Sequence, residues 1–469
     1  MTWWTSGRKE QKNLSLFNGG VPTGAADDKG TVIVIGAGAA GLTAARVLQD
    51  NGRNVLVIEG RDRIGGRMHT FDFGGAAVDE GANWIHGVPE NPLFHLAEEA
   101  GISTTNDDVG HPLRMQVFDS GSGRAVSIFR FVYMLWRANR LSGHFAHESK
   151  SAAHAEANLA ERFEKEIAGV HGKMNQRLLR YGLRTIVDLT MAEKSELLHP
   201  NALAINPDYE NTDDYTIDGG YRQLVNVLAG GLDIRTGTRV TQIRYDEHGV
   251  TVVTDHEEYQ GAHVIVTVPL GVLKSNSIAF DPPLPEQKTQ AIGNLGFGNV
   301  EKVFLKFDFP FWRSSPHQTR HLFHMSDTVG DFPAFLDLTD SSGQPVLCSI
   351  ISGDQSRRLA ADPEPLIDEA TGLLKTMFPD TYQDPTAVHV SNWQNDPFAG
   401  GSYSTPVPGT SAEDYDRLAM PVAGRVLFAG EATYQERGGF VEGAMGSGVR
   451  EARRILGQEV DLVLRKVPT

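Results

Sequence analysis

The chain has too little cysteine and too few long hydrophobic runs to belong to several common classes of protein. Its 469 residues include one cysteine, Cys348, which excludes an intrachain disulfide framework and a cysteine-rich metal site. No apolar run reaches the length of a membrane span, and residues 1–30 contain no apolar core of a signal peptide. We therefore expect a cytoplasmic protein without a membrane partner.

Basic residues are also fewer than acidic ones. The chain has 43 Lys and Arg against 59 Asp and Glu, which gives a formal net charge of −16 at pH 7. This balance argues against nucleic acid as the main partner and is compatible with a cationic substrate, or with solubility alone. Neither a Ser/His/Asp array nor a metal-ligand spacing is present, so we expect no protein nucleophile and no bound metal.

Glycine, by contrast, is plentiful, and its most informative positions lie within residues 31–67. An apolar run at 31–35 predicts a buried parallel strand. The glycines of a G-x-G-x-x-G pattern follow it directly: Gly36, Gly38 and Gly41. A helix ending near Gly52 and a second strand at 54–58 lead to the acid Glu59. This order of strand, tight turn, helix, strand and acid is the dinucleotide-binding fingerprint in its required context.

Each part of this unit has a physical role. Gly36 permits the turn, Gly38 lets backbone approach a pyrophosphate, and Gly41 lets the helix pack on the strand. The helix N-terminus offers free N–H groups to the phosphates, and Glu59 accepts from ribose hydroxyls. A second glycine-arginine loop, with Arg61, Arg63 and Arg67, follows at once and can reach a flavin or pyrophosphate oxygen.

The rest of the chain alternates between two kinds of segment. A well-marked helix begins after the N-cap Asn91 and ends at Gly101. Residues 115–205 are helix-rich, notably 152–168 and 174–198. Short strands follow within 216–281, and the last part returns to a parallel strand at 425–429 and a helix at 441–456.

This alternation predicts an α/β fold in which a Rossmann-like domain, built on a parallel sheet, is interleaved with an α+β substrate-binding domain. The predicted segments are an N-terminal extension (1–30), nucleotide-binding parts (31–114, 216–282, 395–460), substrate-domain parts (115–215, helical, and 283–394) and a C-terminal tail (461–469).

Five motifs together resemble the flavin-containing amine oxidase family over most of residues 31–456. They are the 31–67 block, Gly81–Gly87 (GANWIHG), Asp218–Gly220 (DGG), Val266–Leu273 (VTVPLGVL) and Phe428–Thr433 (FAGEAT). The resemblance implies FAD as the cofactor and oxidation of an amine by O2. It also implies the cofactor-binding residues: Gly36, Gly38, Gly41, Glu59, Arg61, Arg67, Gly81, Ala82, Asn83, Trp84, Val240, Gly430, Glu431 and Val441.

Within that set, the resemblance implies that Glu59 holds the adenosine ribose and that Arg67 sits near the flavin. Val240 would meet the adenine through its backbone, and Glu431 would bind the ribityl or pyrophosphate region. The place of Glu431 after a strand, at the carboxyl edge of the sheet, agrees with where open α/β sheets bind ligands.

The family also places a lysine, which contacts the flavin through a water, where Lys302 falls in the run Val300–Lys306. On an alternating strand Lys302, Phe304 and Lys306 share one face, so spacing alone does not choose between the two lysines. The resemblance favours Lys302. Burial would lower the pKa of such a lysine.

Trp393 precedes a segment, Asp396–Ser404, that resembles the stretch where monoamine oxidases bear a cysteine bonded to the flavin. Ser402 stands in that place, so we expect non-covalent FAD. Tyr403 aligns with one wall of the family's aromatic cage and Phe440 with the other, where a tyrosine is more usual.

His86 lies in a Trp-Ile-His-Gly segment like that of animal-type acetylpolyamine and spermine oxidases. We expect it in a glycine-rich turn, from which it would face a substrate channel and hydrogen-bond an amine. The acidic stretch 208–215 is either the mouth of that channel or a solvated loop.

The sequence therefore predicts an FAD-dependent amine oxidase, monomeric or homodimeric, with Lys302, Tyr403, Phe440, His86 and Trp393 at the catalytic site and a polyamine as substrate. A monoamine, alkaloid-amine or L-amino acid oxidase is the nearest alternative. A flavin desaturase or porphyrinogen oxidase and a non-catalytic flavin-fold protein are weaker ones. A histone demethylase would be expected to carry a long helical insertion and a further binding domain, and the sequence shows neither.

Overall fold

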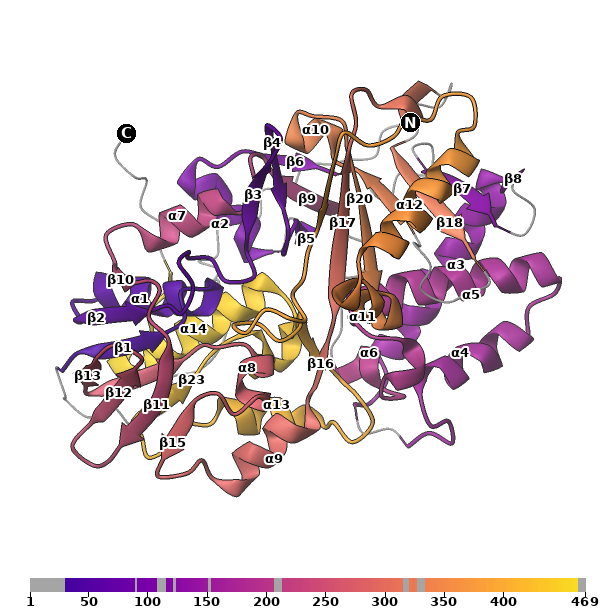
Figure 1. The fold of residues 1–469 in the computed structure, drawn as a ribbon. Coiled ribbons are helices and arrows are strands. Elements are labelled where there is room, and N and C mark those ends of the chain that lie inside the picture. Colours follow the sequence, from indigo (N-terminus) through magenta and orange to yellow (C-terminus); the bar gives the residue numbers. More distant parts are fainter. Residues whose placement is uncertain are drawn as a thin grey trace, which may run out of the picture.

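The computed structural model describes residues 30–88, 91–107, 115–120, 124–150, 153–205, 213–314, 320–326 and 334–462. The predicted N-terminal extension and C-terminal tail therefore lie almost entirely outside the described residues. Figure 1 shows the first and last parts of the described chain, in indigo and yellow, side by side at one end of the molecule. Residues 222–281 from the middle of the chain lie at this same end, and most of the remaining magenta and orange segments form the other end.

One end is built on a five-stranded parallel sheet. Its order is β10–β2–β1–β14–β23, and the strands span Asp233–Arg235, Val55–Ile58, Val32–Ile35, His263–Val266 and Val426–Phe428. Strands from four separate stretches of sequence thus pair in one sheet. This arrangement is the Rossmann-like α/β fold that the sequence predicts.

The two faces of this sheet are covered differently, because successive side chains of a buried strand point to opposite sides. Val32 and Val34 of β1 pack toward helices α1 (Ala39–Asp50), α2 (Pro92–Ala100), α7 (Arg222–Ala229) and α14 (Val441–Leu456). Ile33 and Ile35 pack toward a four-stranded sheet and helices α8 (Leu270–Lys274), α9 (Glu286–Asn294) and α13 (Ala412–Ala419). That sheet has the order β13–β12–β11–β15, spanning Glu258–Gly261, Val250–Thr254, Val240–Tyr245 and Ala279–Asp281.

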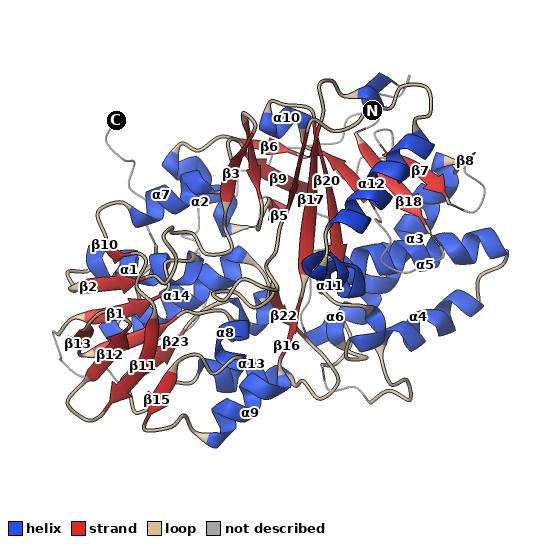
Figure 2. Ribbon diagram, in the orientation of Figure 1, coloured by secondary structure: helices blue, strands red, loops and turns tan. Residues whose placement is uncertain are grey.

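The other end is built on a seven-stranded sheet of order β21–β17–β20–β19–β18–β7–β8. Its strands span Ala387–Val390, Val300–Lys306, Val346–Ser352, Ala334–Asp337, His321–Met325, Met115–Asp119 and Arg124–Ala125. Phe323 and Leu336 pack against helices α3 (Ile128–Ala146), α4 (Leu159–Ala168) and α5 (Lys173–Thr190). Leu322 and Phe335, one residue away, pack against α11 (Gly353–Ala361) and α12 (Glu364–Met377) on the opposite face. Figure 2 shows these helices around the sheet.

Short elements connect the two ends. They are the hairpin β3–β4 (Thr70–Phe73, Ala76–Asp79), the sheet β5–β9–β6 (Trp84–Val88, Asp213–Ile217, Thr104–Asn106) and the pair β16–β22 (Gly296–Gly298, Tyr403–Thr405). The remaining elements are helices α6 (Ala202–Ile205) and α10 (Thr339–Ser342) and the 3-10 turns η2 (Ser195–Leu197), η3 (Phe311–Ser314), η4 (Glu431–Thr433) and η5 (Gln435–Arg437). None of the described helices is both long enough and apolar enough to cross a bilayer.

Several predicted elements are confirmed, and others are wrong at their ends. The helix capped by Asn91 forms as predicted, with the Asn91 side chain accepting from Leu93 N–H at 2.8 Å and Gly101 left-handed. The helix predicted over 174–198 ends at Thr190, because the chain turns at Ala192, whose φ is +56°. Residues 115–119 and 124–125, predicted as part of a helical segment, form β7 and β8, and the alternating Met115, Val117 and Asp119 side chains are buried. The exact limits of the seven predicted segments stay a prediction.

The contact between α1 and α14 leads to a stability prediction. A Cβ on Gly448 of α14 would lie 2.4 Å from the carbonyl oxygen of Ala40, whereas a Cβ on Gly372 of α12 would meet nothing within 4 Å. Gly448→Ala should therefore destabilise the protein by about 1–3 kcal/mol through overpacking. Gly372→Ala should be neutral or stabilise it by up to about 1 kcal/mol. Thermal melts followed by circular dichroism check this, and equal melting temperatures for the two variants would contradict the packing argument.

Candidate active site

The glycine-rich turn after β1 is shaped to receive a pyrophosphate. Gly36 has a φ of +105°, and Gly38 caps α1 without any side-chain hydrogen bond to the first turn of the helix. A Cβ added to Gly66 would lie 3.3 Å from Cα of Gly38, so the two glycine loops meet backbone to backbone. The uncapped N-terminus of a 12-residue helix, faced by glycine backbone, is a fitting phosphate cradle.

Glu59 stands at the end of β2 beside this turn. Its two carboxylate oxygens accept hydrogen bonds from Ala37 N–H and Arg61 N–H, each at 2.8 Å. The backbone of Thr238, two residues before Val240, donates to the carbonyl of Glu59 at 2.9 Å. Glu59, the glycine turn and the start of β11 thus lie together, as the predicted adenosine site requires. The side chain of Arg61 is turned to Asp396, 2.6 Å away.

Glu431 is the meeting point of three separate segments. Its Oε1 lies 2.9 Å from Nη1 of Arg67, and its Oε2 accepts from the Ser404 hydroxyl at 2.6 Å and from Gly439 N–H at 2.9 Å. Glu431 is 3% exposed, so these bonds are made away from water. The preceding Gly430 donates to the Ser447 hydroxyl of α14, the helix that begins at Val441.

This junction sets the positions of the two predicted cage residues. Tyr403 is the neighbour of Ser404 in β22, and Phe440 is the neighbour of Gly439 at the N-cap of α14. A Cβ on Gly439 would lie 3.1 Å from the Tyr403 ring, so only glycine allows so close an approach. The Tyr403 hydroxyl donates to the Leu189 carbonyl at 2.5 Å, which fixes its ring from the far side.

Lys302 is buried, and its ammonium nitrogen is held by backbone. Nζ donates to the carbonyl oxygens of Asp79 at 2.9 Å and Gly81 at 2.7 Å, and it lies 5.4 Å from the Trp84 ring centroid. Burial lowers the pKa of Lys302 and raises that of the Asp79 carboxyl to about 6. Burial therefore favours the neutral form of both groups.

Lys306 has a different environment. Its Nζ donates to the carbonyl of Gly74 at the tip of the β3–β4 hairpin and is half-buried. Between the two lysines, Phe304 packs its ring against Phe71, 5.7 Å away. The shared face predicted for these residues is confirmed. The two lysines differ in burial, since Lys302 is buried and Lys306 is half-buried. Sequence spacing alone did not reveal this difference.

The segment from Gly81 to Trp84 joins the cofactor loop to Lys302. Ala82 N–H donates to the Arg67 carbonyl at 3.1 Å, and a Cβ on Gly81 would lie 3.2 Å from the Trp393 ring. Asn83 is buried in the same segment. Trp393 is 5% exposed, and its indole N–H donates to the Glu80 carbonyl at 3.4 Å.

His86 lies on strand β5 and not in the turn that the sequence analysis expected, because β5 pairs with β9 across Ile85 and Tyr215. Its ring stands edge-on to Phe440 with centroids 5.7 Å apart, and its Nδ1 is 3.0 Å from the Asp214 carboxylate. Most of the acidic stretch 208–215 lies outside the described residues. Asp214 is described, and its side chain is 34% exposed.

Lys302, Trp84, His86 and Phe440 thus form a continuous series of contacts. Gly439, the neighbour of Phe440 in the chain, lies against the Tyr403 ring. Sequence analysis missed the acids around this series. Asp107 accepts from the Trp84 indole N–H, and burial raises its pKa to about 7. The sequence did contain one sign of these acids, because Asp79 and Glu80 directly precede the GANW motif. That acid pair could have predicted carboxylates near the site.

Glu80 is the other acid that was missed. Its two oxygens contact His69 Nδ1 and His389 Nε2, each at 2.8 Å. Burial raises the pKa of Glu80, but the hydrogen bonds from His389 and His69 outweigh it and hold the pKa at about 2. This cluster braces the backbone that carries both carbonyls bonded to Lys302.

The fold and the site define a dinucleotide-binding oxidoreductase class, with a Rossmann-like sheet, a glycine cradle and a buried lysine. A family described as "Flavin containing amine oxidoreductase" matches residues 39–456. The chain belongs to this family, and FAD is accordingly its cofactor. Among the described residues, the cradle, Glu59 and the Arg67–Glu431 pair fit that group.

Relatives of two kinds are similar to this chain. "Lysine-specific histone demethylase 1 homolog 2" of Arabidopsis thaliana is 35% identical over 444 residues, which cover 91% of this chain and 58% of the relative. "Polyamine oxidase 2" of Arabidopsis thaliana is 33% identical over 448 residues, covering 90% and 87%. "Polyamine oxidase 4" of Oryza sativa subsp. japonica is 34% identical over 464 residues, covering 92% and 90%. The chain spans little more than half of the demethylase homologues, 52–58% of three from plants.

The Glu80 cluster predicts a pH dependence of stability. The folded-state pKa of about 2 lies below the ordinary value of 4.5, so the carboxylate stabilises the fold above pH 4.5. That contribution is lost as the pH falls from 4.5 toward 2. Glu80→Gln should therefore lower the melting temperature more at pH 6 than at pH 3, and the matched variant Glu98→Gln, on the exposed side of α2, should not. An equal drop in melting temperature at pH 6 and at pH 3 would show that the stabilising effect of Glu80 does not depend on its charge.

Proposed function

We propose that the protein is an FAD-dependent amine oxidase whose preferred substrate is a polyamine. The observation that carries this proposal is the burial of Lys302 against two carbonyls, at one end of a series of ring contacts that leads to Phe440. Tyr403 lies against the neighbouring Gly439. When bound, FAD accepts a hydride from the carbon next to the substrate nitrogen and is reoxidised by O2, which becomes H2O2. The imine product is hydrolysed by water to an aldehyde or ketone and an amine or ammonia.

The side chain of Lys302 suits a role in holding a proton or a water at a fixed place. A neutral amine has two N–H donors and one lone pair. Both donors are used by the Asp79 and Gly81 carbonyls, so the lone pair remains to accept one further hydrogen bond. Because burial lowers the pKa of Lys302, the neutral form that has this lone pair is more accessible than in an exposed lysine.

Tyr403 and Phe440 bind and orient the substrate nitrogen in this proposal. Both present uncharged ring faces, and the Tyr403 hydroxyl is already bonded to the Leu189 carbonyl. Such a cage favours a neutral amine over an ammonium, since it offers no carboxylate to balance a charge. The reacting nitrogen therefore enters deprotonated.

A distal cationic nitrogen is supported by the groups beyond the cage. His86 contacts Phe440 and bonds to Asp214, and Asp107 accepts a hydrogen bond from the Trp84 indole N–H. A polyamine would place a second, charged nitrogen here, which a monoamine lacks. Histone demethylases are the rival that the comparisons raise, because their identities to this chain are as high as those of the polyamine oxidases. Among the described helices the longest is α3, of 19 residues, so the described part shows no long helical insertion.

The flavin is non-covalent in this proposal. Ser402, at the position of the linking cysteine, has its hydroxyl bonded to both the N–H and the carbonyl of Val300, at 2.8 and 2.9 Å. Acid precipitation should leave all yellow colour in the supernatant, and colour in the pellet would refute this part of the proposal.

Replacing Lys302 with Met should leave FAD bound and slow turnover by about a hundredfold, the usual contribution of a positioned proton-handling group. Lys306→Met is the matched control, because it removes the same group from the same face of β17 at a half-buried position. Rapid-mixing absorbance at the flavin band measures both variants. Slow turnover of Lys306→Met together with normal turnover of Lys302→Met would show that Lys306 is the lysine that acts.

A peroxide-coupled screen of spermine, spermidine, a monoamine and a methylated lysine peptide tests the substrate class. Peroxide should form fastest with the polyamines, and His86→Ala should lower kcat/KM for them by about tenfold, as expected for one lost hydrogen bond to a charged group. The same substitution should lower kcat/KM for the monoamine much less. The control variant His95→Ala, at a half-buried position on α2, should leave kcat/KM unchanged. Peroxide from the peptide alone would replace the polyamine proposal with the demethylase one. No peroxide from any amine would refute the oxidase.

A further inference from the structure

Helix α3 presents an outer face that nothing in the oxidase chemistry uses. Phe129, Tyr133 and Trp136 recur at i, i+4 and i+7, and they are 85%, 53% and 53% exposed. Large hydrophobic side chains so exposed are few among the described residues, and these are the three aromatic ones on a single helix. The opposite side of α3 is buried in the core through Phe131, Met134, Ala138 and Phe145. The helix thus carries large apolar side chains on both sides, and those on its outer side are not covered by any part of the chain that the structure describes.

The charges around this aromatic row all have one sign. Residues 124–147 contain four arginines and no acidic residue, in a chain whose net charge is −16. Arg130 and Arg140 are exposed, Arg137 is half-buried, and none of these three forms an ion pair with a described residue. On the helix, Arg140 continues the row at i+11, and its guanidinium lies 5.5 Å from the Trp136 ring centroid.

We propose that this face, Phe129, Tyr133 and Trp136 with Arg130, Arg137 and Arg140, binds the surface of a bilayer that contains anionic phospholipid. Exposed aromatic side chains beside arginines are the composition of helices that lie in a membrane interface, where rings enter the headgroup layer and guanidinium groups meet phosphates. The face is complementary in charge to such a surface, although the molecule as a whole is not.

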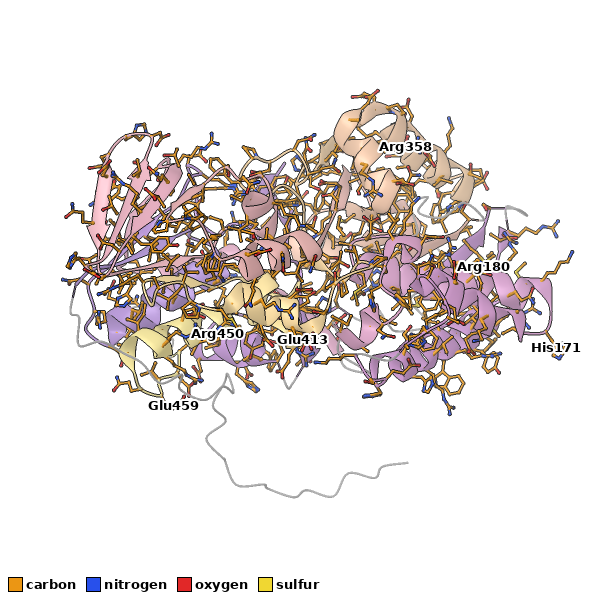
Figure 3. The ribbon with its side chains drawn as sticks, turned by 90° about the horizontal axis from the view of Figure 1, so that it is seen from below. His171, Arg180, Arg358, Glu413, Arg450 and Glu459 are labelled. Atoms are coloured by element: carbon orange, nitrogen blue, oxygen red, sulfur yellow. The ribbon has the colours of Figure 1, made fainter. Side chains whose placement is uncertain are left out.

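A second copy of the chain is a poorer occupant. A two-fold contact through α3 would bring the arginines of one copy against those of the other, which is repulsive. The sequence analysis expected no membrane partner because it sought spanning segments, and it did not predict α3 as a separate helix. Figure 1 shows α3 at the end of the molecule away from the parallel sheet, and Figure 3 shows Arg180 of α5 and His171 at the same end. Binding there would leave the cofactor end free.

The test is sedimentation of the FAD-loaded protein with vesicles of phosphatidylcholine alone or with about 30% phosphatidylserine. The protein should pellet with the anionic vesicles at low salt and be released at high salt. Arg130→Gln/Arg137→Gln/Arg140→Gln should weaken the partition coefficient by about a hundredfold, from the usual contribution of each basic residue near an anionic surface. Phe129→Ser/Tyr133→Ser/Trp136→Ser should abolish binding to the anionic vesicles.

A matched control is Val388→Ser/Met420→Ser, which removes two exposed hydrophobic side chains elsewhere. It should bind vesicles like the wild type, and all variants should keep the FAD spectrum and melting temperature, which shows that they fold. Absence of wild-type binding to anionic vesicles at low salt would overturn the proposal. So would equal loss of binding in the control, or a dimer in light scattering that the aromatic variant Phe129→Ser/Tyr133→Ser/Trp136→Ser dissociates.

Discussion

The structure depends on one buried polar contact, between the Nζ of Lys302 and the carbonyl oxygens of Asp79 and Gly81. Lys302 belongs to the seven-stranded sheet, and the two carbonyls belong to the segment that leads from the β3–β4 hairpin to Trp84. A buried amine without partners would be costly, so the two carbonyls must stay in place for Lys302 to stay inside. Glu80, between them, is itself held by His69 and His389. The position of Lys302, the centre of the proposed site, is therefore set by backbone that Glu80 and its two histidine partners hold in place.

The second constraint is the carboxylate of Glu431. It gathers Arg67 from the cofactor loop, Ser404 from β22 and Gly439 from the start of α14. The two aromatic residues next to Ser404 and Gly439 are placed by the same carboxylate that pairs with the cofactor-loop arginine. In the proposed function, cofactor binding and substrate orientation are therefore coupled through one buried acid, since neither segment can shift without breaking buried hydrogen bonds.

Much of this could be predicted from sequence where local rules decide the structure. The glycine turn and Glu59 follow from strand, turn and helix signals within 31–67, and the Asn91 cap follows from local hydrogen bonding. The strand at 115–119 was missed because its alternating pattern is short and its pairing partner, β18, lies two hundred residues further along the chain. Glu80, Asp107 and the choice of Lys302 over Lys306 could not be derived from spacing, because burial and long-range contacts decide them. His86 was placed on a turn because the glycines around it mask a strand that only β9 stabilises.

The measurement that tests the account most directly is anaerobic mixing of the purified protein with spermine while the flavin absorbance is followed. The proposed site, with Lys302 buried beside an uncharged cage, predicts that the amine bleaches the flavin band within one turnover. It also predicts that admitting O2 restores the band with one peroxide formed per flavin. A flavin that stays oxidised with every amine tried, in protein that is folded and fully loaded, would contradict the account.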